Sequence, residues 1–157
     1  MKLSLRPADD QELAFCESLN RRNMSEYLAA RDIAWDPCGF LASWAEFENS
    51  VILADAHLVG LLRLVPEQDA LGLRDLQIIP ERQGRGIGSW AVGQAKAIAT
   101  SRGFYRLRLR VYEENPAKAL YARLGFKAGS IVGGTVHMTL ELPPNSSFKP
   151  NPLRGSA

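Results

Sequence analysis

The spacing of hydrophobic and polar positions divides the first half of the chain into helices followed by strands. A short apolar strand over 2–5 precedes an acidic segment at 9–12, and carboxylates favour the start of a helix. Apolar residues then recur three or four positions apart in two helical segments, separated by an Asp-Pro-Cys-Gly break at 36–39. From Val51 onward the pattern changes to apolar runs that predict three consecutive antiparallel strands, over 51–54, 58–65 and 71–79.

The second half of the chain alternates helices and strands. A helical pattern over 87–100 ends near Gly103, and a strand over 104–111 alternates apolar residues with arginines. Asn115 before Pro116 is a capping side chain ahead of a proline at the first helical position, which predicts a helix over 117–124. Two last strands follow at 126–132 and 136–142, so the order β-α-α-β-β-β-α-β-α-β-β predicts an α+β fold with a mixed, mostly antiparallel central sheet flanked by helices.

The length of 157 residues suits one domain, which we expect to span residues 1–142. Residues 143–157 are rich in proline and serine, and we expect a flexible tail there. No apolar run approaches the roughly 20 residues that cross a bilayer, which excludes a membrane-spanning protein. The first residues lack the apolar segment of a secretory signal, so we expect a cytoplasmic protein.

Charged residues are distributed unevenly along the chain, although the formal net charge is only +2. Residues 1–81 hold 7 basic and 14 acidic side chains, whereas residues 82–112 hold 7 basic side chains and no acidic ones. A basic block this short favours a localised anionic ligand over nucleic acid. The arginines between 106 and 110 also lack aromatic residues on the same strand face, where bases would stack.

The cysteines and histidines do not form a metal-binding pattern. Cys16 and Cys38 are widely spaced, with no CxxC motif and no nearby histidine pair, so we expect two free thiols and no zinc site. His57 and His137 are each isolated among apolar residues, which favours structural or surface histidines over metal ligands.

A glycine-rich loop lies between the third predicted strand of the meander and the helix that follows it. The segment Pro80-Glu81-Arg82-Gln83-Gly84-Arg85-Gly86-Ile87-Gly88-Ser89 places three glycines within five residues at a helix start. Exposed amides and the helix dipole make such a loop a suitable phosphate site. A dinucleotide fingerprint would need a glycine where Ser89 stands, and a P-loop would need Gly-Lys-Ser/Thr, so neither motif is present.

Three segments together resemble the GCN5-related N-acetyltransferase (GNAT) family. Gln83-Gly84-Arg85-Gly86-Ile87-Gly88 matches the family's acetyl-coenzyme A loop, Gln/Arg-x-x-Gly-x-Gly/Ala. Leu76-Gln77-Ile78-Ile79-Pro80 is similar to the family's fourth strand, and residues 115–126 look like the family's Asn-x-x-Ala-x-x-Leu-Tyr-x-x-x-Gly-Phe segment. The resemblance implies an acyl-coenzyme A N-acyltransferase fold and acetyl-coenzyme A (acetyl-CoA) as cosubstrate, with no metal.

The resemblance also implies a role for each matched residue. Backbone amides of the loop would hold the pyrophosphate of acetyl-CoA, with Arg82 and Arg85 adding charge-assisted bonds. Strand residues 76–78 would pair with the pantetheine arm as an added strand does, and an amide there would stabilise the oxyanion. The implied cofactor-binding residues are Leu76, Gln77, Ile78, Arg82, Gln83, Gly84, Arg85, Gly86, Ile87, Gly88, Ser89 and Asn115.

Two of the matched side chains have a second interpretation. Tyr121 would donate a proton to the departing coenzyme A thiolate, or it would simply pack in the core at helical spacing. Asn115 would contact the pantetheine arm or cap a helix, and the two roles are compatible.

The general base is not identified by the resemblance. Some family members carry a glutamate early in the fourth strand, where this chain has Gly72. Asp75 is close in sequence, but strand alternation places its side chain on the face opposite Leu76 and Ile78. Glu113 and Glu46 are alternatives, although the sequence favours a surface charge over a base for each of them.

The first helices and their loop carry the composition of a small-molecule pocket, with Asn23, Met24, Tyr27, Trp35 and Trp44. The acidic excess of residues 1–81 suits a cationic amine. Arg74, which shares its strand face with the pantetheine positions, would suit a substrate carboxylate instead. Both readings stay open, and the candidate substrate residues are Asn23, Tyr27, Trp35 and Arg74.

The sequence therefore predicts an N-acetyltransferase that moves an acetyl group from acetyl-CoA to a primary amine of a small molecule. The predicted reaction is a direct attack in a ternary complex. Two alternatives remain, namely acetylation of a protein N-terminus or lysine, and a non-catalytic sensor of acyl-coenzyme A. We expect no nucleic-acid or membrane partner, and the resemblance adds a possible homodimer.

Overall fold

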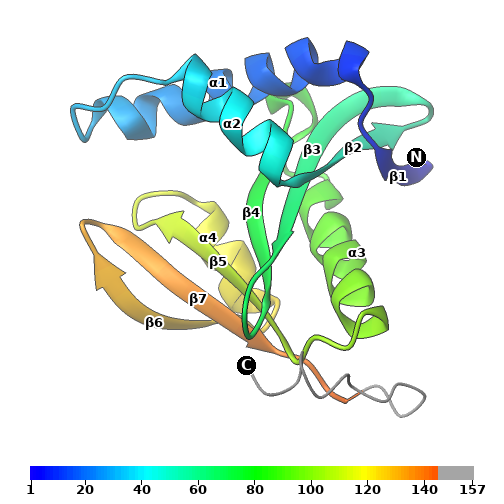
Figure 1. Cartoon of the computed structure of the whole chain (residues 1–157), viewed down its shortest axis with the longest axis vertical. Coiled ribbons are helices and arrows are strands. Elements are labelled where there is room, and N and C mark those ends of the chain that lie inside the picture. Colours follow the sequence, from blue (N-terminus) through cyan, green and yellow to red (C-terminus); the bar gives the residue numbers. More distant parts are fainter. Residues whose placement is uncertain (145–157) are drawn as a thin grey trace. The chain divides into compact units, whose positions relative to one another are not determined.

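The protein contains a seven-stranded mixed sheet flanked by helices (Figure 1). The structure, a computed structural model, describes residues 1–144. The strands lie in the order β1-β2-β3-β4-β5-β7-β6. Along the chain the elements are β1 (Leu3–Pro7), η1 (Asp10–Glu12), α1 (Leu13–Ala29), α2 (Pro37–Glu46), β2 (Glu48–Ala54), β3 (His57–Pro66), β4 (Leu71–Ile78), η2 (Pro80–Arg82), α3 (Ile87–Ser101), β5 (Arg106–Tyr112), α4 (Ala117–Arg123), β6 (Lys127–Val132) and β7 (Thr135–Glu141).

The predicted fold class and the predicted order of strands and helices are confirmed, with two short 3₁₀ turns added. The expected tail begins at residue 143, and beyond Pro144 it lies outside the described residues. Among the helices of residues 1–144, none has the length and apolar character needed to cross a membrane.

The chain divides into two compact units, each of which is described by itself. The first unit consists of Met1–Leu64 and Asp75–Ala91. The second consists of Val65–Arg74 and, within the part of the chain that the structure describes, residues 92–144. Strands β3 and β4 and helix α3 contribute residues to both units.

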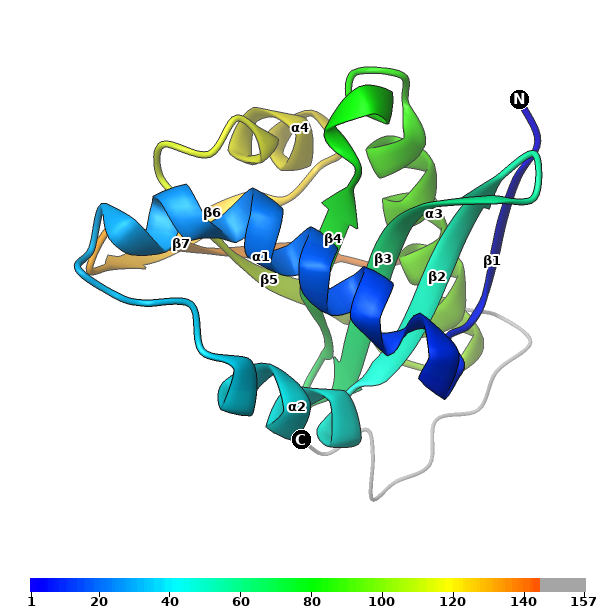
Figure 2. The ribbon, with the colours of Figure 1, turned by 90° about the horizontal axis from the view of Figure 1, so that it is seen from above.

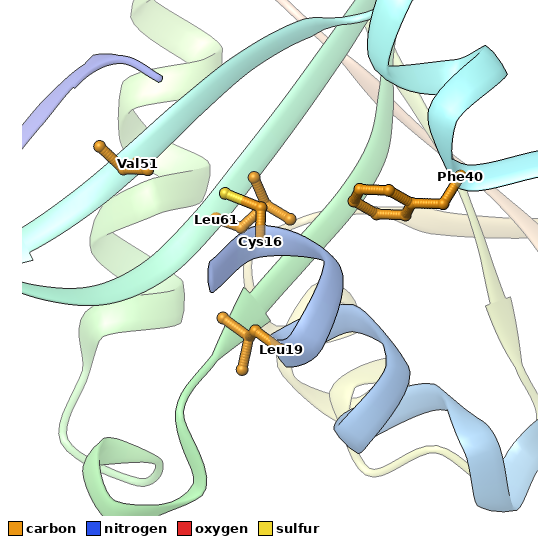
Figure 3. Packing of buried hydrophobic residues seen from close by; sticks show 5 residues of the cluster. All are labelled: Cys16, Leu19, Phe40, Val51 and Leu61. Atoms are coloured by element: carbon orange, nitrogen blue, oxygen red, sulfur yellow. The ribbon is translucent and has the colours of Figure 1, made fainter. Parts of the chain in front are cut away.

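In the first unit, helices α1 and α2 cover one face of an antiparallel strand set. Strand β1 pairs with β2, and β2 pairs with β3, with Val51 opposite Leu61. Figure 2 shows α1 crossing over β2 and β3. Cys16 and Leu19 of α1 point toward the strands and form one buried cluster with Phe40, Val51 and Leu61 (Figure 3). Burial of this apolar surface stabilises the unit and fixes α1 against the strands.

The boundaries of the first two helices differ from the prediction. Helix α1 runs without interruption to Ala29, and Ile33 lies beyond it, half exposed. The predicted break at 36–39 is wrong because Asp36 is the N-cap of α2 and Pro37 is its first residue. The Asp36 side chain accepts from the Cys38 amide at 3.0 Å. A proline at this position loses no helical hydrogen bond, so the same residues that interrupt one helix begin the next.

In the second unit, β5, β7 and β6 form an antiparallel set of strands. The start of β4 pairs with β5 in the parallel direction. Strand β5 pairs with β7 over its whole length, and Leu71 and Gly72 of β4 pair with Leu107 and Arg108. Helix α4 contacts β5. The apolar face of these strands is almost completely buried at Leu107, Leu109, Val136 and Met138.

Two predicted boundaries in the second unit shift slightly. Strand β5 begins at Arg106, two residues later than predicted, although Phe104 is buried. Helix α4 has Pro116, rather than Asn115, at its N-cap position. The predicted capping role of Asn115 is nevertheless present, since its Oδ1 accepts from the Ala117 amide at 2.9 Å.

Candidate functional site

The loop between β4 and α3 has the backbone of an open anion site. Gly84 has φ of +75° and Gly86 has φ of +83°, a region that favours glycine. A Cβ atom at either position would meet nothing within 4 Å, so glycine is required for its backbone conformation and not for lack of space. Helix α3 begins immediately afterwards at Ile87, so its first amides lie beside the loop (Figure 2). Open amides at a helix N-terminus are suited to phosphate.

The charged residues of this loop leave it with a net positive character. Arg85 is exposed and has no polar partner among the described residues. Arg82 is half-buried, and its Nη1 lies 3.8 Å from the sulfur of Met1. Glu81 is ion-paired with Arg22 at 2.7 Å, and the hydrogen bond from Arg22 lowers the pKa of the Glu81 carboxyl. The acidic residue of the loop is thus neutralised by α1, while its arginines remain available.

The end of β4 leads directly into this loop. The register of β4 with β5 covers only Leu71 and Gly72, so the residues from Leu73 onward have no partner in β5. The carbonyl of Ile78 accepts from the side chains of Asn23 and Gln83, each at 3.0 Å. Of the predicted cofactor-binding residues, Gln77, Ile78 and Gln83 are therefore brought together with the predicted substrate residue Asn23.

A buried ion pair that the sequence analysis did not single out lies beside this strand. Arg63 Nε is 3.1 Å from Asp75 Oδ2, and both side chains are 6% exposed. Asp75 also accepts from Asn20 and from Gln77. The sequence carried a signal for the pair, because Arg63 is the one charged residue in the apolar run 58–65 and a buried charge needs a partner.

The predicted substrate residues of the first unit differ in their surroundings. Trp35 packs partly into the core, 5.8 Å from the ring of Phe40, and its Nε1 donates to Asn20 Oδ1 at 2.9 Å. Tyr27 accepts from Arg31 through its backbone carbonyl. Trp35 is therefore connected through Asn20 to the cluster formed by Asp75 with Arg63, Asn20 and Gln77, here called the Asp75 cluster.

The remaining predicted residues lie in the second unit. Tyr121 is 7% exposed and packs edge-on against Phe126, with ring centroids 5.7 Å apart. Arg74 is exposed and lies 3.3 Å from Glu67. The buried environment of Tyr121 fits both roles that the sequence left open.

The basic block is less available to a ligand than its charge count suggests. Arg108 makes a bidentate ion pair with Asp69 at 2.8 and 2.9 Å, and Arg106 also contacts Asp69. The hydrogen bond from Arg108 lowers the pKa of the Asp69 carboxyl, and the same bond raises the pKa of Arg108. Arg106 and Arg108 are thus neutralised by an acidic residue from the preceding block, whereas Arg85 of the glycine-rich loop has no polar partner among the described residues.

No three His, Cys, Asp or Glu side chains within residues 1–144 are grouped so that they could hold a metal ion. The donors of the site are backbone amides, carboxamides and arginines, all of which suit an organic anion.

The strand order and the glycine turn ahead of α3 define the acyl-coenzyme A N-acyltransferase fold. The model of the "Acetyltransferase (GNAT) family" matches residues 10–126. The chain therefore belongs to the GNAT acetyltransferase family, which confirms the resemblance seen in its motifs.

Solved structures of this family share the fold at low sequence identity. A PaiA N-acetyltransferase from Thermoplasma acidophilum in complex with coenzyme A is 19% identical, with a TM-score of 0.72 over 90% of this chain and 99% of that one. The spermidine N-acetyltransferase from Vibrio cholerae, in complex with coenzyme A and spermine, is 22% identical, with a TM-score of 0.70 over 88% of this chain and 95% of that one.

A third similar structure comes from a protein-modifying enzyme. The ribosomal-protein-S18-alanine N-acetyltransferase from Escherichia coli is 16% identical, with a TM-score of 0.70 over 94% of this chain and 99% of that one. No curated protein matches the chain in sequence. The structural matches show the fold, and they include proteins whose names give different acceptors.

Proposed function

We propose that this protein is an acetyl-CoA-dependent N-acetyltransferase that acetylates a primary amine of a small molecule by direct attack in a ternary complex. Membership in the GNAT family supports acetyl transfer. The observation that carries the proposal is the glycine turn at Gly84 and Gly86, whose positive φ angles lead the backbone into α3 with open space beside both glycines. Such a turn suits the pyrophosphate of acetyl-CoA.

The glycine-rich loop and the end of β4 would each bind a different part of the coenzyme. Amides of residues 84–89 would bind the pyrophosphate, with Arg82 and Arg85 supplying charge-assisted bonds. The edge of β4 at residues 76–78 would hydrogen-bond the pantetheine arm as an added strand does. The short register between β4 and β5 supports this assignment, because it leaves that part of β4 without a partner in β5. Asn115 remains a proposed contact of the coenzyme as well as a capping residue.

The chemistry follows from the attack of a neutral amine on the thioester carbon. A C–N bond forms, the C–S bond breaks, and a backbone amide of β4 would stabilise the oxyanion between these steps. Tyr121 would donate its phenolic proton to the departing thiolate. The amine would pass its proton to a chain of water molecules, because this chain has glycine at residue 72, where the resemblance suggested a glutamate base.

The ion pair of Arg74 with Glu67 supports a cationic acceptor over an anionic one. A substrate carboxylate at Arg74 would have to compete with the Glu67 carboxylate, whose Oε2 lies 3.3 Å from Arg74 Nη1. Asn23 and Trp35 would contribute to the acceptor region from the first unit, and both are connected to the Asp75 cluster. We therefore favour a polyamine or another small cationic amine.

The proposal is tested by binding and turnover on the full chain. Acetyl-CoA at 100 times its Kd should stabilise the fold by about 2.7 kcal/mol, which a thermal-shift measurement resolves. Free thiol release is then followed with polyamines, amino acids, and peptides with a free N-terminus or lysine. Absence of stabilisation would overturn the assignment. Stabilisation without turnover on any amine favours a sensor, and turnover on the peptides alone favours protein acetylation.

The role of Tyr121 has its own test. Replacing Tyr121 with Phe removes the proton donor while keeping the ring that packs on Phe126, and we expect kcat to fall by about 100-fold or less with KM nearly unchanged. A thiolate is a tolerable leaving group, so activity should persist. Tyr105→Phe, at an exposed tyrosine, is the matched control. Unchanged turnover in Tyr121→Phe would leave only the packing role.

A further inference from the structure

We propose that Asp75 is a positioning residue of the coenzyme site, which fixes the orientation of two carboxamides, Gln77 and Asn23, beside the carbonyl of Ile78. The proposal rests on the proposed function, because Ile78 belongs to the strand edge assigned to the pantetheine arm. It goes beyond that function by linking the edge to a buried ion pair in the same unit.

Hydrogen bonds to both oxygens hold the carboxylate of Asp75 in place. Its Oδ2 accepts from Arg63 Nε at 3.1 Å and from Asn20 Nδ2 at 2.6 Å, and its Oδ1 accepts from Gln77 Nε2 at 2.8 Å. As the partner of a guanidinium, this carboxylate offers only acceptors. Every neighbour must therefore present a donor to it.

Arg63, the partner of Asp75, is itself immobilised. Its guanidinium lies 4.4 Å from the ring centroid of Phe40 and 5.0 Å from that of Phe47, and its Nη1 donates to Ser43 Oγ at 2.7 Å. Cation–π contacts and a charge-assisted hydrogen bond hold the group from α2 and from the residue that ends it. The hydrogen-bond network that runs from Asp75 through Gln77 and Asn23 to Ile78 therefore begins at a rigid ion pair.

The acceptor-only character of Asp75 determines how the two carboxamides point. Gln77 must turn its Nε2 toward Asp75, which leaves its Oε1 facing α1. Asn23 must then turn its Nδ2 toward Gln77. This nitrogen donates to Gln77 Oε1 and to the carbonyl of Ile78, each at 3.0 Å. A carboxamide turned by half a rotation has nearly the same shape and opposite polarity, so its orientation depends on such a fixed neighbour.

The Ile78 peptide is consequently held on both sides. Its carbonyl receives Asn23 Nδ2 and Gln83 Nε2, and the next amide, that of Ile79, donates to the Val59 carbonyl at 2.9 Å. Gln83 is exposed, and this is its one side-chain bond among the described residues. An N–H of the pantetheine arm can therefore replace Gln83 at this carbonyl, while Asn23 stays fixed by the network.

Asn23 also provides a second acceptor for the ligand. Its Oδ1 has no partner among the described residues and is not sealed from solvent. With Asn23 in this orientation, the edge presents two acceptors, Asn23 Oδ1 and the Ile78 carbonyl. Secondary amides, of which the pantetheine arm carries two, supply the matching N–H donors.

Replacing Asp75 with Asn should reverse this polarity. The new carbonyl oxygen can keep Arg63 and Asn20, but the new NH₂ group then faces the NH₂ group of Gln77. Gln77 must turn, Asn23 must turn in response, and Asn23 Oδ1 would then face the Ile78 carbonyl. Loss of this hydrogen bond and of the outward acceptor should weaken acetyl-CoA binding by about tenfold or more.

Calorimetric titration of the full chain with acetyl-CoA tests the proposal. We expect weaker binding for Asp75→Asn, and for Gln77→Glu because two carboxylates then face each other. The double variant Asp75→Asn/Gln77→Glu should recover to within about threefold of the unsubstituted protein, because an acceptor-only group at residue 77 again requires a donor from Asn23. Asp69→Asn, an isosteric change in the second unit, should leave the Kd unchanged.

A merely structural role of Asp75 gives a different pattern. Arg63 loses its carboxylate in the double variant as well, so a structural role makes that variant no better than Asp75→Asn. Failure of the double variant to recover would overturn the proposal. Should Asp75→Asn not fold, Asn23→Asp leaves the buried pair intact and must still weaken binding at least tenfold, or the proposal is wrong. No binding by the unsubstituted chain would instead contradict the proposed function.

Discussion

The carboxylate of Glu67 lies directly over Gly72. A Cβ atom at residue 72 would be 2.7 Å from Glu67 Oε2 and 3.1 Å from the carbonyl oxygen of Val65. Gly72 is the position at which the resemblance to the family led us to look for a glutamate base, and a side chain there would press on both oxygen atoms. The Glu67 carboxylate, from the turn that precedes β4, occupies the space beside Gly72, and its Oε2 lies 3.3 Å from Arg74 Nη1.

Gly72→Ala should therefore destabilise the protein, by about 1–3 kcal/mol, because the added methyl group overlaps two oxygen atoms. Urea unfolding monitored by tryptophan fluorescence measures the change. Adding Glu67→Ala should recover part of the loss, since it removes one of the two overlaps and leaves the Val65 carbonyl. Additive effects of the two substitutions would show that Glu67 does not limit the space at Gly72.

Gly86→Ala should cost about 1–2 kcal/mol of stability and weaken acetyl-CoA binding. The reason is conformational, because φ at Gly86 is +83° and nothing lies within 4 Å of the added Cβ atom. Gly93→Ala is the matched control in the middle of α3, where the surroundings are equally open and the backbone is helical. That variant should gain about 0.5–1 kcal/mol. Equal effects at the two glycines would contradict the backbone argument.

The two cysteines should differ sharply in reactivity. Burial raises the pKa of the Cys16 thiol to about 12, and the side chain is fully buried in the first-unit core. Cys38 is exposed in the first turn of α2. A chromogenic disulfide reagent should titrate one thiol in the native protein and the second only after unfolding. Rapid reaction of both thiols in native buffer would mean that the Cys16 core opens readily.

Acid should weaken the fold partly through Glu12. The hydrogen bond from Arg6, at 2.7 Å between Nη2 and Oε2, lowers the pKa of the Glu12 carboxyl below its ordinary value of 4.5. A carboxyl whose pKa is lowered by folding stabilises the protein above its unfolded pKa, and this contribution is lost as the pH falls through the folded value.

Urea unfolding at pH 7 and pH 3 tests this expectation. Glu12→Gln should lower the stability more at pH 7 than at pH 3, since the contribution of a carboxyl whose pKa is lowered by folding is complete above the unfolded pKa and shrinks as the pH falls below it. Asp10→Asn, at an exposed residue without a side-chain partner among the described residues, should change the stability little at either pH. A pH-independent effect of Glu12→Gln would exclude the Arg6 interaction as its cause.

The order of strands and helices and the loop at 83–88 could be predicted because their signals are local. Apolar periodicity reports which face of each element is buried, and glycine permits the positive φ found at Gly84 and Gly86. The Asp36-Pro37 pair was misread because an N-cap followed by proline resembles a break when the preceding helix ends nearby. Whether Asp36-Pro37 ends one helix or begins another depended on the residues that follow, which form α2.

The sequence by itself determined the elements, the glycine turn and the motifs of the GNAT family. Only the tertiary structure decided which polar residues meet. Asp75 joins Arg63, 12 residues away, with Asn20, 55 residues away, and Asp69 neutralises Arg108 across 39 residues. Such partners are set by strand register and by how α1 packs on the strands, and neither follows from local periodicity.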